Sequence, residues 1–186
     1  PNIKFIDAKF HKLIKVWETD WNQELNTVLP RSVTEQALEA IEKYPNKRVI
    51  IHYLPPHYPF IGETGERLRE ESIIEHHSNG ISFWKQLQSD SVPEKEFIGA
   101  YEENVQIALN EVERLAAELQ TKTIVSSDHG NEYGKWGIYG HPAGLYTSSL
   151  VEVPWLELPH SSRKNIITEG VESKSDSIND ETRNSL

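Results

Sequence analysis

The sequence contains no cysteine and no methionine. Without cysteine there can be no disulfide framework, no thiolate zinc site and no cysteine nucleophile. No apolar run approaches the roughly 18 residues that a membrane-spanning helix needs, and no signal-peptide core is visible. The net charge of −10 argues against sequence-independent binding to nucleic acid, which requires a basic surface. We therefore expect a cytoplasmic protein with no membrane span and no nucleic-acid partner.

The length of 186 residues is enough for one domain with a real core. We expect this domain to cover residues 1–160. Residues 161–186 are rich in Ser, Lys, Asn, Glu and Asp, and cannot bury enough apolar area to offset their ordering entropy, so they predict a disordered tail. The chain starts at Pro1 rather than at methionine, which indicates either a lost initiator or a piece of something longer.

Helical spacing is visible in three stretches. Apolar residues at positions 10, 13, 14, 17 and 21 predict a first helix. Ser32 and Glu35 match a capping box, which places the start of a second helix at Ser32. A continuous apolar stripe from Pro93 to Gln120 predicts the longest helix, with Tyr101 and Asn104 near its start.

Apolar, β-branched runs at 48–54 and 123–125 are typical of buried parallel strands. Each run alternates with a predicted helix, which favours an α/β fold with a mostly parallel sheet flanked by helices. Residues 149–158 predict one or two further edge strands, and residues 81–87 a lid over the pocket. Ligands of open α/β sheets bind at the carboxyl ends of the strands, so the residues that follow these runs are the first candidates for a site.

The strongest candidate is Asp128-His129-Gly130, directly after the strand predicted at 123–125. A carboxylate and an imidazole together suit zinc, manganese or a similar divalent ion. Gly130 allows the backbone to turn so that both side chains can face one point. The same tripeptide is also an ordinary turn, in which Asp caps and Gly takes a positive φ.

Two more histidines stand in rigid loops. His57 follows the strand predicted at 48–54 and lies between prolines, and His141 lies between Gly140 and Pro142. Each has an alternative role as a loop histidine packed on its neighbours. The pair His76-His77 lies in a charged, helical stretch, where adjacent residues do not face each other, so we expect both to be exposed.

These motifs resemble the carboxyl-terminal part of the sulfatase and alkaline-phosphatase-like superfamily. The resemblance rests on Ser126-Ser127-Asp128-His129-Gly130, Tyr139-Gly140-His141, Val153-Pro154-Trp155-Leu156 and the loop from Leu54 to Phe60, in that family's order. It spans about 49–158 and is nearest to uncharacterised archaeal sulfatase-like proteins. It implies an alkaline-phosphatase-like fold, here as an incomplete domain.

The resemblance also implies roles for individual residues. Asp128 and His129 would hold one divalent metal ion, zinc, manganese or calcium. His57 and His141 would act as catalytic residues that contact a sulfate or phosphate ester, or protonate its leaving oxygen. Imidazolium donors stabilise charge that develops in a transition state, and imidazole can serve as a general acid.

The chain departs from the family in its amino-terminal half. The superfamily has a strand ending in a metal-binding Asp, followed by a Ser, Thr or modified Cys nucleophile at the start of a helix. Asp7 follows an apolar run of the expected form, but no nucleophile segment follows it. Thr19, Thr27 and Ser32 are candidates only by default.

Three hypotheses remain open. The chain is the carboxyl-terminal part of a metal-dependent hydrolase, inactive alone without its nucleophile segment, which predicts an exposed apolar sheet edge where missing strands or a second copy would pair. Alternatively, it is a degenerate relative that binds an anionic ligand or a protein partner without catalysis, with a well-covered sheet. In the third hypothesis the site is illusory, and the four candidate side chains lie far apart.

Overall fold

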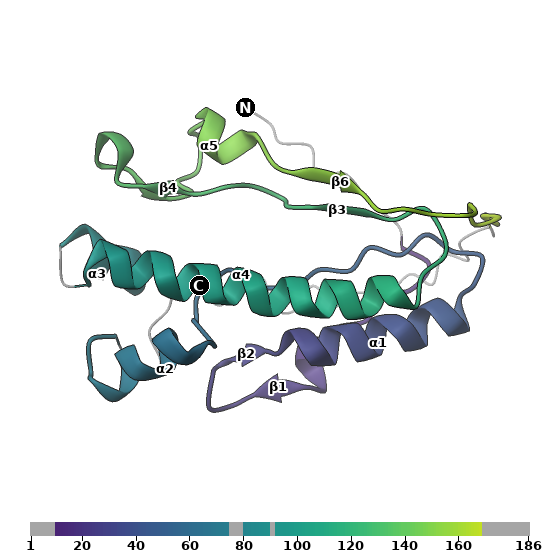
Figure 1. Ribbon diagram of the computed structural model, residues 1–186, viewed down its shortest axis with the longest axis horizontal. Helices are drawn as coiled ribbons and strands as arrows, with labels where there is room; N and C mark the ends of the chain where they lie inside the picture. Colours follow the sequence, from purple (N-terminus) through teal and green to yellow (C-terminus); the bar gives the residue numbers. More distant parts are fainter. Residues whose placement is uncertain (1–9, 75–79, 90–91, 169–186) are drawn as a thin grey trace, which may run out of the picture.

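The computed structural model describes residues 10–74, 80–89 and 92–168 of the chain. Short strands and longer helices alternate along these residues (Figure 1). The elements are η1 (Val16–Glu18), β1 (Trp21–Asn22), β2 (Thr27–Val28), α1 (Pro30–Lys43), α2 (Glu63–Glu70), α3 (Gly80–Gln88), α4 (Glu94–Ala117), β3 (Ile124–Ser126), β4 (Glu132–Tyr133), η2 (Lys135–Gly137), β5 (Tyr139–Gly140), α5 (Ser148–Val151) and β6 (Trp155–Glu157).

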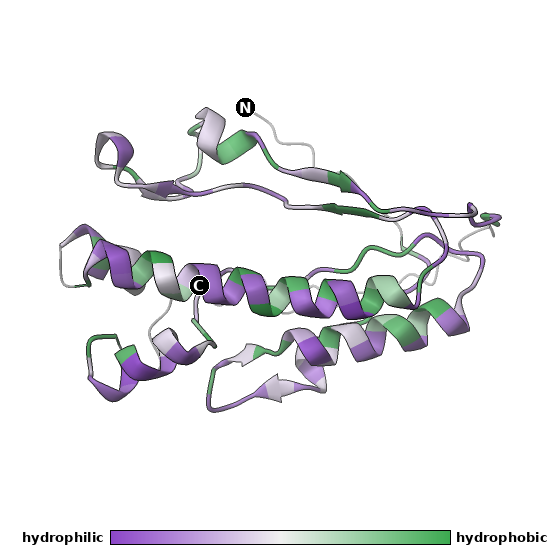
Figure 2. Cartoon of the chain, viewed as in Figure 1, coloured by the Kyte–Doolittle hydropathy of each residue, from purple (hydrophilic) through white to green (hydrophobic). Residues whose placement is uncertain are grey.

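Helix α4 is the central element. It packs against α1 and α2, while β3 and β6 run along its other side (Figure 1). Its prediction from the apolar stripe is confirmed, with Pro93 as the N-cap and Glu94 and Glu96 in the first turn, where acidic side chains favour the helix dipole. Figure 2 shows apolar residues of α4 alternating with charged ones, as an amphipathic helix requires.

The core lies at the amino-terminal end of α4. Aromatic and aliphatic side chains from several segments pack there in one cluster: Phe60, Leu68, Ile74, Leu87, Val92, Phe97 and Ala100. The rings of Phe60 and Phe97 meet edge to face at 5.6 Å, a favoured aromatic geometry, and both side chains are only 1% exposed. This cluster ties the loop that precedes α2 to α4.

The predicted parallel sheet is wrong, and so is the alkaline-phosphatase-like core. The described residues contain only two-stranded sheets, and all three are antiparallel. β3 forms at 124–126, one residue beyond the strand predicted at 123–125, but it pairs with β6. The β4–β5 hairpin and α5 lie between the two strands in the chain. This connection lets β6 run back along β3, whereas a parallel pair would require a crossover connection between them.

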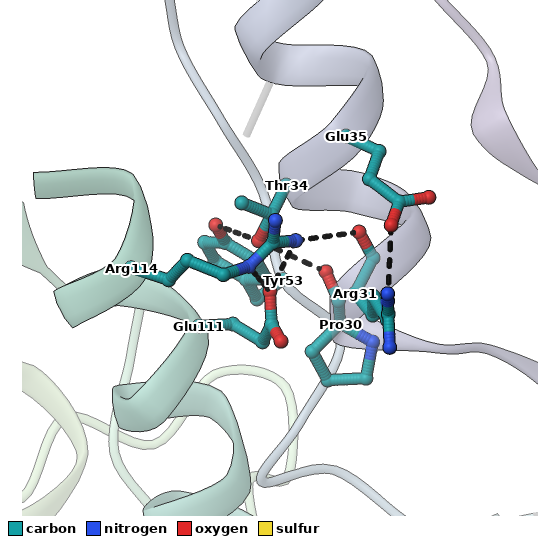
Figure 3. Close-up of polar contacts among 7 residues, drawn as sticks. All are labelled: Pro30, Arg31, Thr34, Glu35, Tyr53, Glu111 and Arg114. Atoms are coloured by element: carbon teal, nitrogen blue, oxygen red, sulfur yellow. Dashed lines mark hydrogen bonds and ion pairs between the residues drawn. The ribbon is translucent and has the colours of Figure 1, made fainter. Parts of the chain in front are cut away.

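Residues 48–54 adopt no strand, against the prediction. No strand among the described residues pairs with them, because β3 pairs with β6 instead. The apolar run still packs at one point. The Tyr53 hydroxyl and the Thr34 hydroxyl of α1 lie 2.9 Å apart, next to the ion pair of Glu111 and Arg114 on α4 (Figure 3). Elsewhere the run is open, with Ile50 82% exposed.

The amino-terminal predictions also need correction. The described part of the stretch predicted as a first helix contains only the short η1, followed by the β1–β2 hairpin. Helix α1 starts at Pro30, not after a Ser32 cap, and its N-cap Leu29 makes no side-chain capping bond. Proline at the first helical position has φ already set for a helix and lacks the N–H that would go unpaired, which explains the earlier start.

Toward the carboxyl end, the region predicted as edge strands divides into α5 and β6. Ser162 forms a parallel bridge with Thr121, and the Ile167 N–H donates to the Asn46 carbonyl, while 169–186 lie outside the described residues. No helix among those the structure describes combines the length and apolarity that crossing a membrane requires.

Candidate functional site

The loop after β3 carries the first two candidate residues. Gly130 holds this loop against α5, since its N–H donates to the Leu150 carbonyl at 3.0 Å. A Cβ at position 130 would lie 2.0 Å from the Ser149 carbonyl oxygen, so only glycine fits there. Close approach of two backbones, rather than the expected positive φ, therefore explains the glycine.

Asp128 and His129 face each other across this turn. The Asp128 Oδ2 and His129 Nε2 atoms lie 3.7 Å apart, and the other carboxylate oxygen accepts the His129 backbone N–H at 3.0 Å. The His129 Nδ1 lies 2.9 Å from the Gly130 carbonyl oxygen. A carbonyl can only accept, so Nδ1 carries a proton, and Nε2 is the nitrogen that faces the carboxylate.

His141 reaches the same point from the β4–β5 hairpin. The imidazoles of His129 and His141 have their centroids 4.1 Å apart. Gly140 has a φ of 72°, and a Cβ there would lie 3.0 Å from the Trp84 ring of α3, so both the turn and the packing favour glycine. The His141 Nδ1 lies 2.8 Å from the Asn131 Oδ1.

His57 completes the group from the loop between Leu54 and Phe60. Its imidazole centroid lies 6.5 Å from that of His141. The buried Asn104 of α4 holds this loop: its amide nitrogen donates to the His57 and Pro59 carbonyls at 3.3 and 3.0 Å, and its oxygen accepts the Ile61 N–H at 2.8 Å. Three bonds from one fully buried amide fix the backbone beside His57.

The surroundings of His141 disfavour its protonated form. Partial burial lowers the pKa of His141, and repulsion from His129 and His57 lowers it further, while the Asp128 carboxylate opposes the shift. A cation other than a proton would gain from the same carboxylate and lone pairs.

The structure thus brings together all four residues that the sequence singled out, from three separate loops. The third hypothesis predicted that these four side chains lie far apart, and the observed distances do not agree with it. Within the described ranges, however, no group of three or more His, Cys, Asp or Glu side chains has the disposition of a metal-binding set. The nearest side-chain atoms of Asp128 and His129 lie 3.7 Å apart, His141 stacks beside His129, and His57 lies beside His141.

The other residues that the sequence analysis considered lie away from these four side chains or outside the described residues. Asp7, His76 and His77 lie outside the described residues. Thr19 follows η1 and Thr27 belongs to β2. The β1–β2 hairpin lies beside α1, on the side of α4 away from β3 (Figure 1). The predicted lid forms α3, whose Trp84 packs on the core and on Gly140.

Two amides that the sequence analysis did not assign, Asn104 and Asn131, position site histidines. Asn104 offered a signal: it is a polar residue at spacing 97, 100, 104, 108 on the apolar stripe of α4, where a buried amide must find partners. Asn131 offered none beyond its place after Gly130.

Comparisons with known proteins do not extend this description. No protein-family model matches the chain, and no similar curated protein or solved structure was found.

Proposed function

We propose that Asp128 and His129 hold one divalent metal ion, with His57 and His141 placed to contact a sulfate or phosphate group beside it. The chain would thereby provide the metal and oxyanion site of a sulfatase- or phosphatase-like hydrolase. Support for this proposal comes from the geometry of the four side chains and from the motifs that surround them.

The distance between Asp128 Oδ2 and His129 Nε2 is the observation that carries the proposal. Two atoms bound to one tetrahedral ion at about 2.0–2.1 Å lie roughly 3.4 Å apart. The observed 3.7 Å is close to this separation. A small rotation of either side chain, both of which are solvent-accessible, would bring both atoms onto one ion.

Two further imidazoles stand beside this pair. A tetrahedral oxyanion carries its charge on several oxygens, so it needs donors from more than one direction. His141, whose ring centroid lies 4.1 Å from that of His129, and His57, whose ring centroid lies 6.5 Å from that of His141, are the imidazoles placed to offer such N–H donors. Bound metal would act as a Lewis acid toward the ester oxygen.

A non-catalytic function is the alternative. The described residues contain no serine or threonine hydroxyl that the structure pairs with one of the three imidazoles as a base, so we assign no nucleophile to them. A chain with the same four side chains and no nucleophile would bind an anionic ligand, or a partner carrying one, without turning it over.

Metal titration tests the site directly. We expect isothermal titration calorimetry with Mn²⁺ or Zn²⁺ to give one site per chain, and Asp128→Asn to abolish the heat. The matched control is Asp20→Asn, which neutralises an exposed aspartate just after η1. This variant should bind metal as the wild type does. Equal heats for the wild type and Asp128→Asn would refute the metal site.

Turnover separates the two functions. We expect the isolated chain to bind inorganic sulfate or phosphate only when metal is present, and to hydrolyse neither an aryl sulfate nor an aryl phosphate. Metal-dependent hydrolysis that Asp128→Asn abolishes would show that the chain contains its own nucleophile. Oxyanion binding that ignores the metal would contradict the shared site.

A further inference from the structure

The turn that carries Asp128 and His129 is in backbone contact with α5. The Gly130 N–H donates to the Leu150 carbonyl at 3.0 Å, and a Cβ at position 130 would lie 2.0 Å from the Ser149 carbonyl oxygen. Helix α5 has only four residues, too few to form a stable helix alone. The position of the turn therefore depends on the contacts that hold α5 in place.

One of these contacts comes from Thr147, the N-cap residue of α5. Threonine is a common N-cap because its hydroxyl oxygen can accept a hydrogen bond from a backbone N–H of the first turn. The Thr147 side chain makes no such capping bond. Its hydroxyl donates instead to Oε1 of Glu132, at 2.5 Å. The hydroxyl thus joins α5 to β4 rather than stabilising the end of its own helix.

Glu132, the first residue of β4, is only 2% exposed. Glutamate is rarely buried to this degree, because a carboxylate removed from water costs free energy unless it is hydrogen-bonded. Glu132 lies opposite Gly140 in the β4–β5 pair, and His141 directly follows Gly140. Its carboxylate therefore joins the hairpin that carries His141 to the helix that holds the Gly130 turn; β4 and α5 lie at the same end of the strand layer (Figure 1).

We propose that Glu132 and Thr147 are positioning residues: their hydrogen bond holds α5 against the β4–β5 hairpin and so keeps the turn of Asp128 and His129 beside His141. This contact explains how two imidazoles from separate loops come to lie with their centroids 4.1 Å apart. The inference rests on the proposed function and deepens it, since it names the contact outside the site on which the placement of the metal-binding pair depends. Removal of groups that orient metal ligands commonly lowers metal affinity by about 10–100-fold.

Two measurements on the full chain follow this arrangement, one without metal and one with it. In the metal-free chain, the nuclear Overhauser effect between the ring protons of His129 and His141 shows whether the two imidazoles lie side by side. Isothermal titration calorimetry with Mn²⁺ gives the dissociation constant, which depends on the placement of the turn. Urea denaturation shows that each variant is folded under the conditions of both measurements.

Thr147→Val keeps the shape of the side chain but removes the hydroxyl. We expect this variant to lose the Overhauser effect between His129 and His141 and to bind Mn²⁺ about 10–100-fold more weakly. Thr147→Ser retains a hydroxyl and should restore both. Glu132→Gln still offers an oxygen that accepts the Thr147 hydroxyl, so the Overhauser effect should persist. Glu132→Asp keeps the charge but draws the carboxylate back by one methylene, so this variant should lose the effect, and the test does not depend on the folding of Thr147→Val alone.

Thr34→Val is the matched control. Thr34 also has a hydroxyl that joins two segments, since it donates to the Pro30 carbonyl at 3.2 Å and lies 2.9 Å from the Tyr53 hydroxyl, in the helical half. Loss of this hydroxyl should lower the free energy of unfolding, as loss of the Thr147 hydroxyl does. It should leave both the Overhauser effect and the Mn²⁺ affinity unchanged, because Thr34 does not contact α5 or the β4–β5 hairpin.

The two proposals can fail separately. No Overhauser effect in the wild type, an effect retained in Thr147→Val, or an effect lost equally in Thr34→Val would overturn the role of Glu132 and Thr147, whether or not the chain binds metal. Loss of the effect in Glu132→Gln would remove the hydrogen bond as its cause. A chain that binds no Mn²⁺ but loses the Overhauser effect in Thr147→Val and keeps it in Thr34→Val would contradict the proposed function alone.

Discussion

The helical half of the molecule and its strand layer differ in how they hold their shape. In the helical half, Phe60 and Phe97 are 1% exposed, and a contiguous apolar cluster surrounds them. In the strand layer, Trp155 of β6 is 73% exposed and every residue of β6 is classed as exposed. The first half is stabilised by burial, and the second by backbone pairing and polar contacts.

The site lies where these two regions meet, and the difference explains how its side chains are held. Asp128 and His129 leave the strand layer through a turn that only glycine permits, and the His141 ring bonds to Asn131 of the same loop. The buried Asn104 amide of α4 holds the backbone at His57, so the core positions that loop directly. In the strand layer, Trp155 and Leu156 of β6 are exposed.

Loss of the Phe97 ring should produce the largest effect. Phe97→Ala opens a cavity in the core and should lower the free energy of unfolding by about 3–5 kcal/mol. Urea denaturation followed by circular dichroism measures this. Ile98→Ala, the next residue on α4 and 39% exposed, is the matched control and should cost far less. Equal losses would show that the core does not lie where the structure places it.

Removal of the Asn104 amide should have the next largest effect. Asn104→Ala leaves the buried Ile61 N–H without an acceptor, at a cost of about 1–3 kcal/mol. It should also release the His57 loop, so the His57 imidazole signals should shift in NMR spectra while those of His160 do not. A stability loss without any change at His57 would show that Asn104 serves the core alone.

Loss of the Trp155 side chain should change the free energy of unfolding far less than loss of Phe97. Trp155→Ser removes a large side chain that buries little area, so the free energy of unfolding should change by less than about 0.5 kcal/mol. The same urea titration applies. A loss comparable to that of Phe97→Ala would mean that Trp155 is covered in solution, for example by a second copy of the chain, and a concentration-dependent sedimentation coefficient would then accompany it.

The smallest effect on stability should come from the ion pair of Lys122, just before β3, and Glu157 of β6. The hydrogen bond from Lys122 lowers the pKa of the Glu157 carboxyl from its ordinary value of 4.5. A carboxyl with a lowered pKa stabilises the fold above its unfolded pKa, and this contribution is lost as the pH falls through the folded value. The stability difference between wild type and Glu157→Gln should therefore shrink between about pH 6 and pH 3. A constant difference would contradict the pairing.

The sequence predicted the clustering of four candidate side chains better than it predicted the fold. Asp128, His129, His141 and His57 were identified from their positions after apolar runs and beside glycine or proline, and the structure brings them together. Those local constraints act within a few residues, so they are readable from the sequence. Of the two apolar runs, the one at 123–125 correctly indicated a strand, but neither run contains information on which strand pairs with which.

The predictions for the run at 48–54 and for the start of α1 were wrong for different reasons. The run at 48–54 has the composition of a parallel strand, yet β3 pairs with β6, and the described residues supply no other strand for that run. Ser32 and Glu35 match a capping box, but Pro30 two residues earlier begins the helix. The run at 48–54 forms no strand because no strand pairs with it among the described residues. Helix α1 begins earlier than the capping box predicted because Pro30 is a stronger signal for a helix start.

The most direct test of the central claim is paramagnetic line broadening by Mn²⁺. Added below one equivalent, Mn²⁺ should broaden the imidazole signals of His129 first, then those of His141 and His57, and leave those of His11, His52 and His160 sharp. This is the order that one ion between Asp128 and His129 requires. Uniform broadening of all histidines, or earlier broadening of His160 than of His129, would contradict a metal site at the end of β3.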